Sequence, residues 1–254
     1  MIKLDKKKSH EIVENCSLGI VKSYNIEGCN YYVKSDDDLK EVIGFYLATY
    51  LELNSIEYVG IKIKGHFYSF SRDINELYDF KEANRYYIPL AACELLKIID
   101  CISKVSNNPN LTIDILKMYV FDILFLNDDR HACNWGLINE NELVLFDNFN
   151  IFSIYNPPYI NYNPELFISN NKIRLCNSIY SDFEEFLNNC DEEILEIIYK
   201  MVNKASLENI KAIFELIEKK YQIKINDRFI RIYEPHYKKI LEIINRKRGI
   251  NNAR

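Results

Sequence analysis

Two short polar stretches carry the residue types that phosphoryl transfer requires. The first follows an apolar run and contains Asp129 and Asn134, and the second begins at Asp147, directly after the apolar residues 143–146. Transfer of a phosphoryl group needs a carboxylate that orients the attacking hydroxyl and accepts its proton, and oxygen ligands that hold Mg²⁺ on the phosphates. Asp129 is a candidate for the first role, and Asn134 and Asp147 are candidates for the second.

A predicted hairpin explains how residues thirteen positions apart could share one ion. Residues 135–138 and 143–146 have strand-like character and flank the turn-like stretch 139–141. A hairpin brings its two ends together, so Asn134 and Asp147 are expected to converge. Taken singly, each polar residue is also an ordinary turn or helix-stop signal. The joint pattern, Asp-Arg-His-x-x-Asn followed by a hairpin that ends in Phe-Asp, is much more specific.

This pattern resembles the catalytic and metal-binding segments of HipA-like kinases over residues 121–149. The Asp-Arg-His-x-x-Asn core is also similar to that of phosphoinositide kinases, whereas ordinary protein kinases use a related loop in the order His-Arg-Asp. The resemblance implies that Asp129 is the catalytic base and that Asn134 and Asp147 are metal ligands. It also implies that His131 shapes the loop or contacts phosphate.

The chain departs from the family directly after the metal-binding aspartate. HipA-like sequences usually continue as Asp-Asn-Gly or Asp-Phe-Gly, whereas this chain has Asn148 and then Phe149. A glycine would allow a positive φ or a close backbone approach, which Phe149 does not offer as easily. This departure keeps open the alternative of an ATP-binding pseudokinase that acts as an interaction module.

A second resemblance lies in the N-terminal part of the chain. Lys34 ends the predicted strand 31–33, and Glu41 lies in the first turns of the following helix, as in the lysine and glutamate pair that holds the ATP phosphates in kinases. Lys34 could equally be a solvated strand end and Glu41 a surface helix residue. No Gly-x-Gly-x-x-Gly loop is present, so the loop 15–19 would cover the phosphates, with Ser17 contributing a hydroxyl or N–H.

The elements that must position these residues fall into two groups. Short β-branched and aromatic runs predict strands around one helix, in the order strand, strand, helix, strand, strand, at residues 19–21, 31–33, 39–51, 58–63 and 68–70. The turn-forming residues 25–28 separate the first two strands. Asp36 to Asp38 precede the helix and are expected to cap its free N–H groups. This part is predicted to be a small antiparallel sheet with one packed helix.

Helical periodicity dominates from about residue 84. Apolar stripes predict helices at 87–99, 111–123, 183–187, 194–202, 207–217 and 237–244, and the Pro-, Asn- and Tyr-rich stretch 148–180 reads as an extended loop. The fold class is therefore α+β, a two-lobed protein-kinase-like fold with a small antiparallel sheet lobe and a mainly helical lobe. We expect an ATP-clamping lobe at residues 1–75 and a catalytic lobe at 76–254.

Composition limits the remaining possibilities. The seven cysteines are odd in number and form no Cys-x-x-Cys pair, the N-terminus lacks the apolar core of a secretory signal, and no stretch is apolar enough to span a membrane. A cytoplasmic protein with reduced thiols is expected. The net charge of −5 argues against nucleic-acid binding. His10, His66 and His236 show no metal-site spacing and are interpreted as surface or packing residues.

The function that the sequence favours is an ATP- and Mg²⁺-dependent phosphotransferase, which resembles a HipA-like serine/threonine kinase with a protein substrate. The Tyr-rich stretch 155–163 follows the metal-binding segment and could hold such a substrate. A small-molecule or lipid kinase would share every catalytic residue, because the substrate is chosen outside the phosphate machinery. The sequence leaves this alternative, the pseudokinase and the oligomeric state open.

Overall fold

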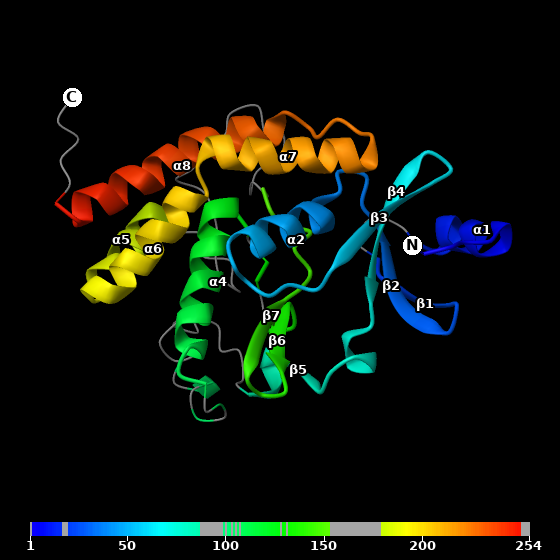
Figure 1. Cartoon of the computed structure of the whole chain (residues 1–254), viewed down its shortest axis with the longest axis horizontal. Helices are drawn as coiled ribbons and strands as arrows, with labels where there is room; N and C mark the ends of the chain where they lie inside the picture. The colour runs from blue at the N-terminus through cyan, green and yellow to red at the C-terminus, as the bar shows by residue number, and fades with distance from the viewer. Residues whose placement is uncertain are drawn as a thin grey trace.

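The structure is a computed structural model that describes residues 2–16, 20–86, 99, 101–102, 104, 106, 108–127, 129–130, 132–152 and 179–249. Its described elements form a sheet-rich part and a helix-rich part, which lie at opposite ends of the molecule (Figure 1). Ser17, His131, the stretch 155–163 and most of the helix expected at 87–99 lie outside the described residues.

The sheet-rich part is a four-stranded antiparallel sheet in the order β1-β2-β4-β3. Its strands are β1 (Lys22–Ile26), β2 (Cys29–Ser35), β3 (Tyr58–Ile63) and β4 (His66–Arg72). This arrangement confirms the predicted order of strand, strand, helix, strand, strand.

The first strand was misplaced in the sequence-based prediction at residues 19–21. Glu27 and Gly28 both have positive φ, as a two-residue hairpin turn requires, and Ile26 pairs with Cys29 across it. This turn fixes the register, and the strand extends back from Ile26 to Lys22, which pairs with Val33. The apolar Ile20 and Val21 precede the strand and are exposed.

Helix α1 (Lys6–Asn15) was not predicted from the sequence. Asp5 caps it by accepting a hydrogen bond from the Lys8 N–H at 2.7 Å. The helix buries only Ile12, so its apolar stripe is too short to stand out from the lysine-rich sequence. Ile12 joins one face of the sheet in a buried cluster, which consists of Ile12, Cys16, Tyr24, Ile26, Val33, Ile63, Tyr68 and Phe70.

Helix α2 (Lys40–Tyr50) packs with the helical part and not with this cluster. Its buried residues Val42, Ile43, Leu47 and Ala48 join the large core that also contains the inner side chains of α4 and α7. Strand residues alternate between the two faces of a sheet, so Lys34, next to the α1-facing Val33, points to the opposite face. That face borders the candidate site.

The helix-rich part begins with a three-stranded sheet in the order β5-β6-β7. Strands β6 (Trp135–Ile138) and β7 (Glu142–Leu145) form the predicted hairpin, and β5 (Phe80–Glu82) adds a third strand that three residues are too few to reveal in the sequence. Short 3-10 helices, η1 (Ile74–Glu76) and η2 (Ala83–Arg85), flank β5.

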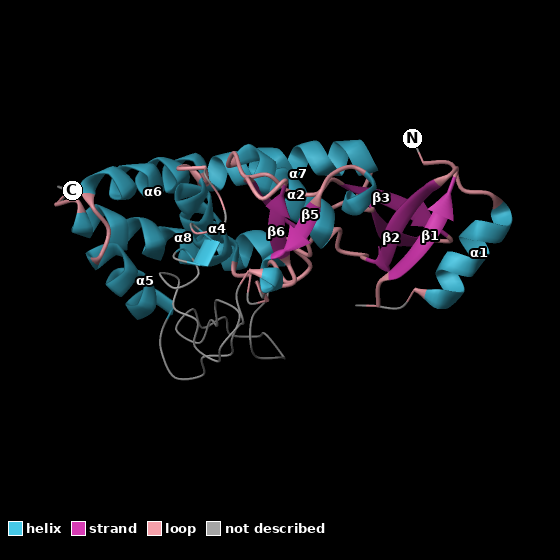
Figure 2. Cartoon of the chain, turned by 90° about the horizontal axis from the view of Figure 1, so that it is seen from below, coloured by secondary structure: helices cyan, strands magenta, loops and turns pink. Residues whose placement is uncertain are grey.

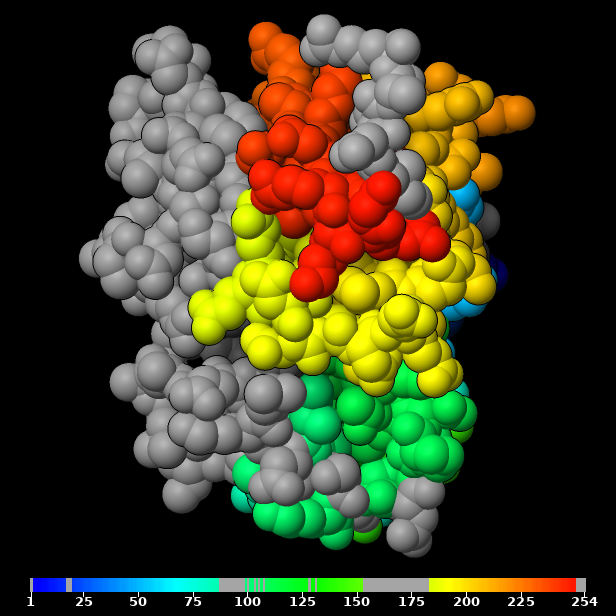
Figure 3. Space-filling view, turned by 90° about the vertical axis from the view of Figure 1, so that its left-hand side faces the viewer, coloured from blue at the N-terminus to red at the C-terminus, as the bar shows by residue number. Residues whose placement is uncertain are grey.

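The remaining helices enclose the core. They are α4 (Leu111–Phe125), α5 (Ile179–Asn188), α6 (Glu192–Lys204), α7 (Leu207–Tyr221) and α8 (Arg228–Lys247). Figure 2 shows α4, α5, α6 and α8 on the side away from the four-stranded sheet, while α7 extends to β3, and Figure 3 shows α5, α6 and the end of α8 covering the far end of the molecule. Within the described part of the chain, no helix is long and apolar enough to cross a membrane.

Helix α8 is tied to the end of α4 by a buried histidine. The Nε2–H of His236 donates to the carbonyl oxygen of Ile123 at 2.6 Å, in the last turn of α4, where helix carbonyls have no partner further along the helix. Burial lowers the pKa of His236 to about 4, although the bond to Ile123 opposes the shift. His236 is therefore a packing residue, as interpreted from the sequence.

This burial makes the stability of the fold sensitive to acid. The folded protein binds fewer protons than the unfolded chain between pH 6.5 and about 4, so the contribution of His236 is complete above pH 6.5 and is lost as pH falls towards 4. We expect this group to account for about 3 kcal/mol of lost unfolding free energy. Urea unfolding of the wild-type protein and of the non-titrating control His236→Gln measures the unfolding free energy across this pH range. Identical pH dependence in both proteins would contradict the assignment.

Candidate active site

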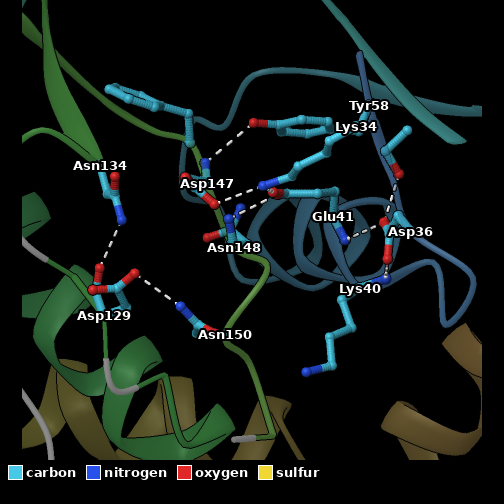
Figure 4. A network of polar contacts seen from close by, with 12 residues as sticks. Lys34, Asp36, Lys40, Glu41, Tyr58, Asp129, Asn134, Asp147, Asn148 and Asn150 are labelled. Carbon is cyan, nitrogen blue, oxygen red and sulfur yellow. Dashed lines mark hydrogen bonds and ion pairs between the residues drawn. The ribbon is translucent and has the colours of Figure 1, made fainter. Parts of the chain in front are cut away.

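The centre of the site is a buried lysine between two carboxylates that are far apart in the sequence (Figure 4). Lys34 of β2 contacts Glu41 Oε1 on α2, and its Nζ lies 2.8 Å from Oδ1 of Asp147, which follows β7. Lys34 is 5% exposed and Glu41 is fully buried. The structure thus excludes the alternatives of a solvated strand end for Lys34 and a surface position for Glu41.

Lys34, Glu41 and Asp147 shift one another's pKa values. Burial alone would lower the pKa of Lys34, but Glu41 and Asp147 raise it above its usual value. Burial would raise the pKa of Asp147, but Lys34 holds it below the usual range. For Glu41 burial prevails over Lys34 and raises the pKa to about 8. The site therefore presents an ammonium group and an ionised carboxylate at neutral pH, which suits a phosphate and its Mg²⁺ ion.

A buried aspartate fixes the start of the helix that carries Glu41. Asp36 accepts hydrogen bonds from the N–H groups of Lys40 at 2.8 Å and Glu41 at 3.0 Å, and from the hydroxyl of Ser69 at 2.5 Å. Ser69 pairs with Lys34 across β2 and β4. Asp36 therefore caps α2, as the sequence predicted for this aspartate, and also joins the helix to the strand next to the lysine.

The backbone after Asp147 packs directly on α2. The Asn148 N–H donates to Glu41 Oε2 at 2.7 Å, and Gly44, one turn further along α2, faces the same residue. A Cβ atom on Gly44 would lie 2.4 Å from Cβ of Asn148. The glycine therefore permits the close approach that places Asp147 beside Lys34.

We expect Gly44→Ala to displace Asn148 and to destabilise the protein by up to about 2 kcal/mol. Overpacking costs about 1–3 kcal/mol, and the better helix propensity of alanine offsets about 1 kcal/mol of it. Urea unfolding measures the change. Thr49→Ala is the matched control, because Thr49 is an exposed residue of α2. Equal stability of the two variants would show that the contact is not tight.

Arg130 organises the loop between α4 and the hairpin. Its guanidinium group is buried and donates to the carboxylate of Asp122 and to the carbonyl oxygens of Asn134 at 2.6 Å and Phe146 at 2.7 Å. It also donates to Oδ1 of Asn148 at 2.6 Å. One side chain therefore links the end of α4 to both metal-binding candidates through their backbone neighbours.

Asp129 and Asn134 are held by a set of amides. The Asp129 carboxylate accepts a hydrogen bond from Asn150 Nδ2 at 2.8 Å. The backbone N–H of Asp129 donates to Asn127 Oδ1 at 3.3 Å. Asn134 Nδ2 donates to the Asp129 carbonyl oxygen at 2.7 Å. A carbonyl can only accept, so Asn134 keeps its own amide oxygen for another ligand.

The hairpin brings the two metal-ligand candidates to one end, as the sequence predicted. Trp135 pairs with Leu145, and the Phe146 N–H donates to the Asn134 carbonyl oxygen at 3.2 Å. Asp147 follows directly and its N–H donates to the hydroxyl of Tyr58 at 3.1 Å.

The residue that replaces the family's glycine does not carry the positive φ. That conformation falls on Asp147, with φ of 50°, whereas Phe149 is free of this constraint. The Phe149 ring instead lies under two cations, with its centroid 4.8 Å from Lys34 Nζ and 5.4 Å from Lys40 Nζ. The loop geometry therefore does not depend on a glycine at this position.

A cavity of about 280 Å³ opens beside the lysine, between the four-stranded sheet and the hairpin. Lys34 and Asp147 line one part of it, and apolar side chains, among them Val21, Phe80 and Phe146, line other parts. An apolar compartment next to a cation suits a ligand with a flat base and a phosphate chain.

The oxygen donors fit Mg²⁺ only together with such a ligand. Among the described residues there is no group of three or more His, Cys, Asp or Glu side chains that could hold a metal alone. Mg²⁺ commonly binds through one or two carboxylates plus substrate phosphates. Asp147, whose side chain is 37% exposed, and the amide oxygen of Asn134 match that requirement.

Sequence reasoning missed the residues that support the site, namely Asp122, Arg130, Asn148, Asn150, Tyr58 and Gly44. Arg130 and Asn148 stand inside the two motifs, so their position alone was a usable signal. Tyr58 and Gly44 act through tertiary contacts that leave no mark in the sequence. Ser17 and His131, which were candidates, lie outside the described residues.

Comparisons with known sequences gave no match, whereas comparisons with solved structures found proteins of similar fold. The sequence matches none of the protein-family models and none of the curated proteins with which it was compared. Among solved structures, it is similar to the proinflammatory kinase CtkA of Helicobacter pylori, with 17% identity, a TM-score of 0.64, and coverage of 97% of this chain and 96% of that one.

It is also similar to HipA of Shewanella oneidensis MR-1, solved in a toxin–antitoxin complex with HipB and operator DNA. The identity is 10%, the TM-score is 0.65, and the match covers 99% of this chain and 74% of HipA. Both similarities extend over nearly the whole chain. The protein therefore has the two-lobed α+β fold of HipA-like, protein-kinase-like proteins.

Proposed function

We propose that this protein is an ATP- and Mg²⁺-dependent phosphotransferase that acts on serine or threonine hydroxyls of a protein substrate. The observation that carries the proposal is the contact of Lys34 with both Glu41 and Asp147, at a cavity with apolar walls. This arrangement offers one cation for phosphate oxygens and one carboxylate for a metal ion, on the fold of known kinases.

In this proposal each side chain has a separate task. Lys34, held by Glu41, binds phosphate oxygens of the nucleotide. Asp147 and the amide oxygen of Asn134 hold Mg²⁺, which when bound neutralises charge on the phosphates and orients them. Asp129 accepts the proton of the acceptor hydroxyl and keeps its oxygen directed at the phosphorus atom.

The amide contacts of Asp129 support its task. Asn150 donates to one carboxylate oxygen and Asn134 donates to the backbone carbonyl of the same residue. These bonds restrict the carboxylate without neutralising it. A base that is fixed before the substrate arrives loses little entropy in the reaction.

We further propose an ATP-clamping lobe at residues 1–75 and a catalytic lobe at 76–254. Lys34 and the four strands belong to the first, and the hairpin and Asp129 belong to the second. We also propose a reducing compartment such as the cytoplasm, because Cys16, Cys29, Cys101 and Cys190 form no disulfide within the described part of the chain.

The test is transfer of label from γ-labelled ATP in the presence of Mg²⁺. The purified protein is incubated alone, with a generic basic protein, and with phosphoinositide vesicles, and Lys34→Met serves as the inactive control. Label on the protein acceptor or on the enzyme itself, absent with Lys34→Met, supports a protein kinase. Label found only on lipid would show that the protein is a lipid kinase and not a protein kinase. MgATP binding without transfer to any acceptor would favour the pseudokinase.

A further inference from the structure

The helix that carries Glu41 is anchored in the helical part of the molecule. The buried side chains of α2 belong to the same core cluster as those of α4 and α7, together with Tyr58 of β3 and Phe67 of β4, while the other face of the sheet forms a separate cluster with α1. Lys34 and Glu41 therefore stand on elements with different packing partners. Contacts between α2 and the helical part therefore help to set the position of Glu41 relative to Lys34.

One contact point lies where β3, the start of α2 and the end of α7 meet. A Cβ atom on Gly60 of β3 would lie 2.7 Å from Leu39 Cδ2 and 3.1 Å from Tyr221 Cε1. The Gly60 N–H also faces the Tyr221 hydroxyl, with a nitrogen–oxygen distance of 3.4 Å. Leu39 and the Tyr221 ring therefore pack against the same spot of the strand.

The backbone at this point is strained. Leu39, which precedes α2, has φ of 53° and ψ of 34°, a left-handed conformation that is unfavourable for a bulky residue. Its side chain is fully buried. Such a conformation persists only where surrounding contacts enforce it. The Asp36 cap holds it on the sheet side, and the Tyr221 ring lies close to it on the α7 side.

Two polar contacts extend this attachment along α2. Lys220 Nζ donates to the Tyr46 hydroxyl at 2.7 Å, and Arg228, the first residue of α8, pairs with Asp38 at 2.8 Å. Figure 1 shows α7 running alongside α2 towards the sheet. The end of α7 thus contacts the second turn of α2, and the start of α8 contacts the segment that precedes α2.

We infer that Tyr221 is a positioning residue, which holds the first turn of α2 so that Glu41 stays beside Lys34. The inference rests on the proposed function, in which that pair binds the ATP phosphates. It also implies that the chain's own C-terminal helices contribute to the alignment of α2.

The experiment compares Tyr221→Ala and Tyr221→Leu with Tyr221→Phe, which keeps the ring. Hydrogen exchange of the α2 amides and the dissociation constant of MgATP are both measured. Ile243→Ala is the matched control, because Ile243 is a core residue of α8 beside Leu187 of α5, away from α2.

Loss of the ring is expected to speed exchange in residues 40–43 and to weaken MgATP binding about tenfold, since ångström-scale misplacement of a binding group has effects of this order or larger. Tyr221→Phe is expected to behave like wild type. Ile243→Ala is expected to lower stability while leaving α2 exchange and MgATP affinity unchanged.

The two ways of failing are distinguishable. Unchanged α2 exchange in both Tyr221→Ala and Tyr221→Leu, with MgATP binding intact, would overturn the positioning role alone. Equal loss of affinity in Ile243→Ala would also overturn it, because the effect would then follow stability. A wild-type protein that binds no MgATP would instead remove the proposed function.

Discussion

Asp129→Asn is expected to bind MgATP as wild type does and to transfer phosphoryl groups about 10²–10⁴-fold more slowly. The variant keeps the shape of the side chain and can still contact Asn150, but it cannot accept the proton of the acceptor hydroxyl. The Asp129 carboxylate contacts Asn150, whereas Lys34 contacts Glu41 and Asp147, so binding of the nucleotide should be spared. Steady-state rates and MgATP titrations of the same preparation measure the two effects.

Asp147→Asn provides the contrast. This variant keeps an oxygen near Lys34 but removes the negative charge that a metal ligand supplies, so Mg²⁺-dependent binding of ATP should weaken together with the rate. If Asp129→Asn lost MgATP affinity while Asp147→Asn kept it, the two roles would have to be exchanged.

Arg130→Met is expected to lower the free energy of unfolding by about 3–5 kcal/mol. Arg130 is 1% exposed, and removing it leaves the fully buried Asp122 carboxylate without its charged partner. The loss also frees the carbonyl oxygens of Asn134 and Phe146 and the side chain of Asn148. Urea unfolding at pH 7 measures the change.

The matched variant adds Asp122→Asn to Arg130→Met. It removes the uncompensated charge while keeping an amide that can bond to Asn127, so part of the lost stability should return. A cost of less than about 1 kcal/mol for Arg130→Met alone would place Arg130 among ordinary surface ion pairs, which contribute about that much or less.

The parts of the site that the sequence could predict are those that lie in one continuous motif or one hairpin. Asn134 and Asp147 are joined by a hairpin whose turn residues and alternating strands are local properties. Lys34 and Glu41 are separated by one predicted strand end and one helix start. In both cases the sequence distance is short enough that secondary structure alone limits where the side chains go.

The parts that it could not predict depend on contacts between distant segments. Gly44 matters because Asn148 packs on it, 104 positions away, and nothing in the helix sequence marks it. The contact of Lys34 with Asp147 spans 113 positions. Helix α1 was not predicted because it buries only one side chain, and β5 was not predicted because it is only three residues long.

Phe149 shows how a correct motif can still mislead about geometry. The absent glycine suggested a distorted loop, since glycine takes up positive φ at least cost. In the structure the positive φ occurs at Asp147, and the Phe149 ring contacts Lys34. Loop shape was thus decided by where the segment packs, against α2 and Arg130, and not by the identity of one residue.

The most direct test of the central claim is a calorimetric titration of the wild-type protein with ATP, with and without Mg²⁺. The Lys34, Glu41 and Asp147 cluster should give saturable binding that strengthens with Mg²⁺ and is strongly weakened by Lys34→Met. Absence of binding under both conditions, or binding of equal strength by Lys34→Met, would contradict the assignment of this cluster as a nucleotide site.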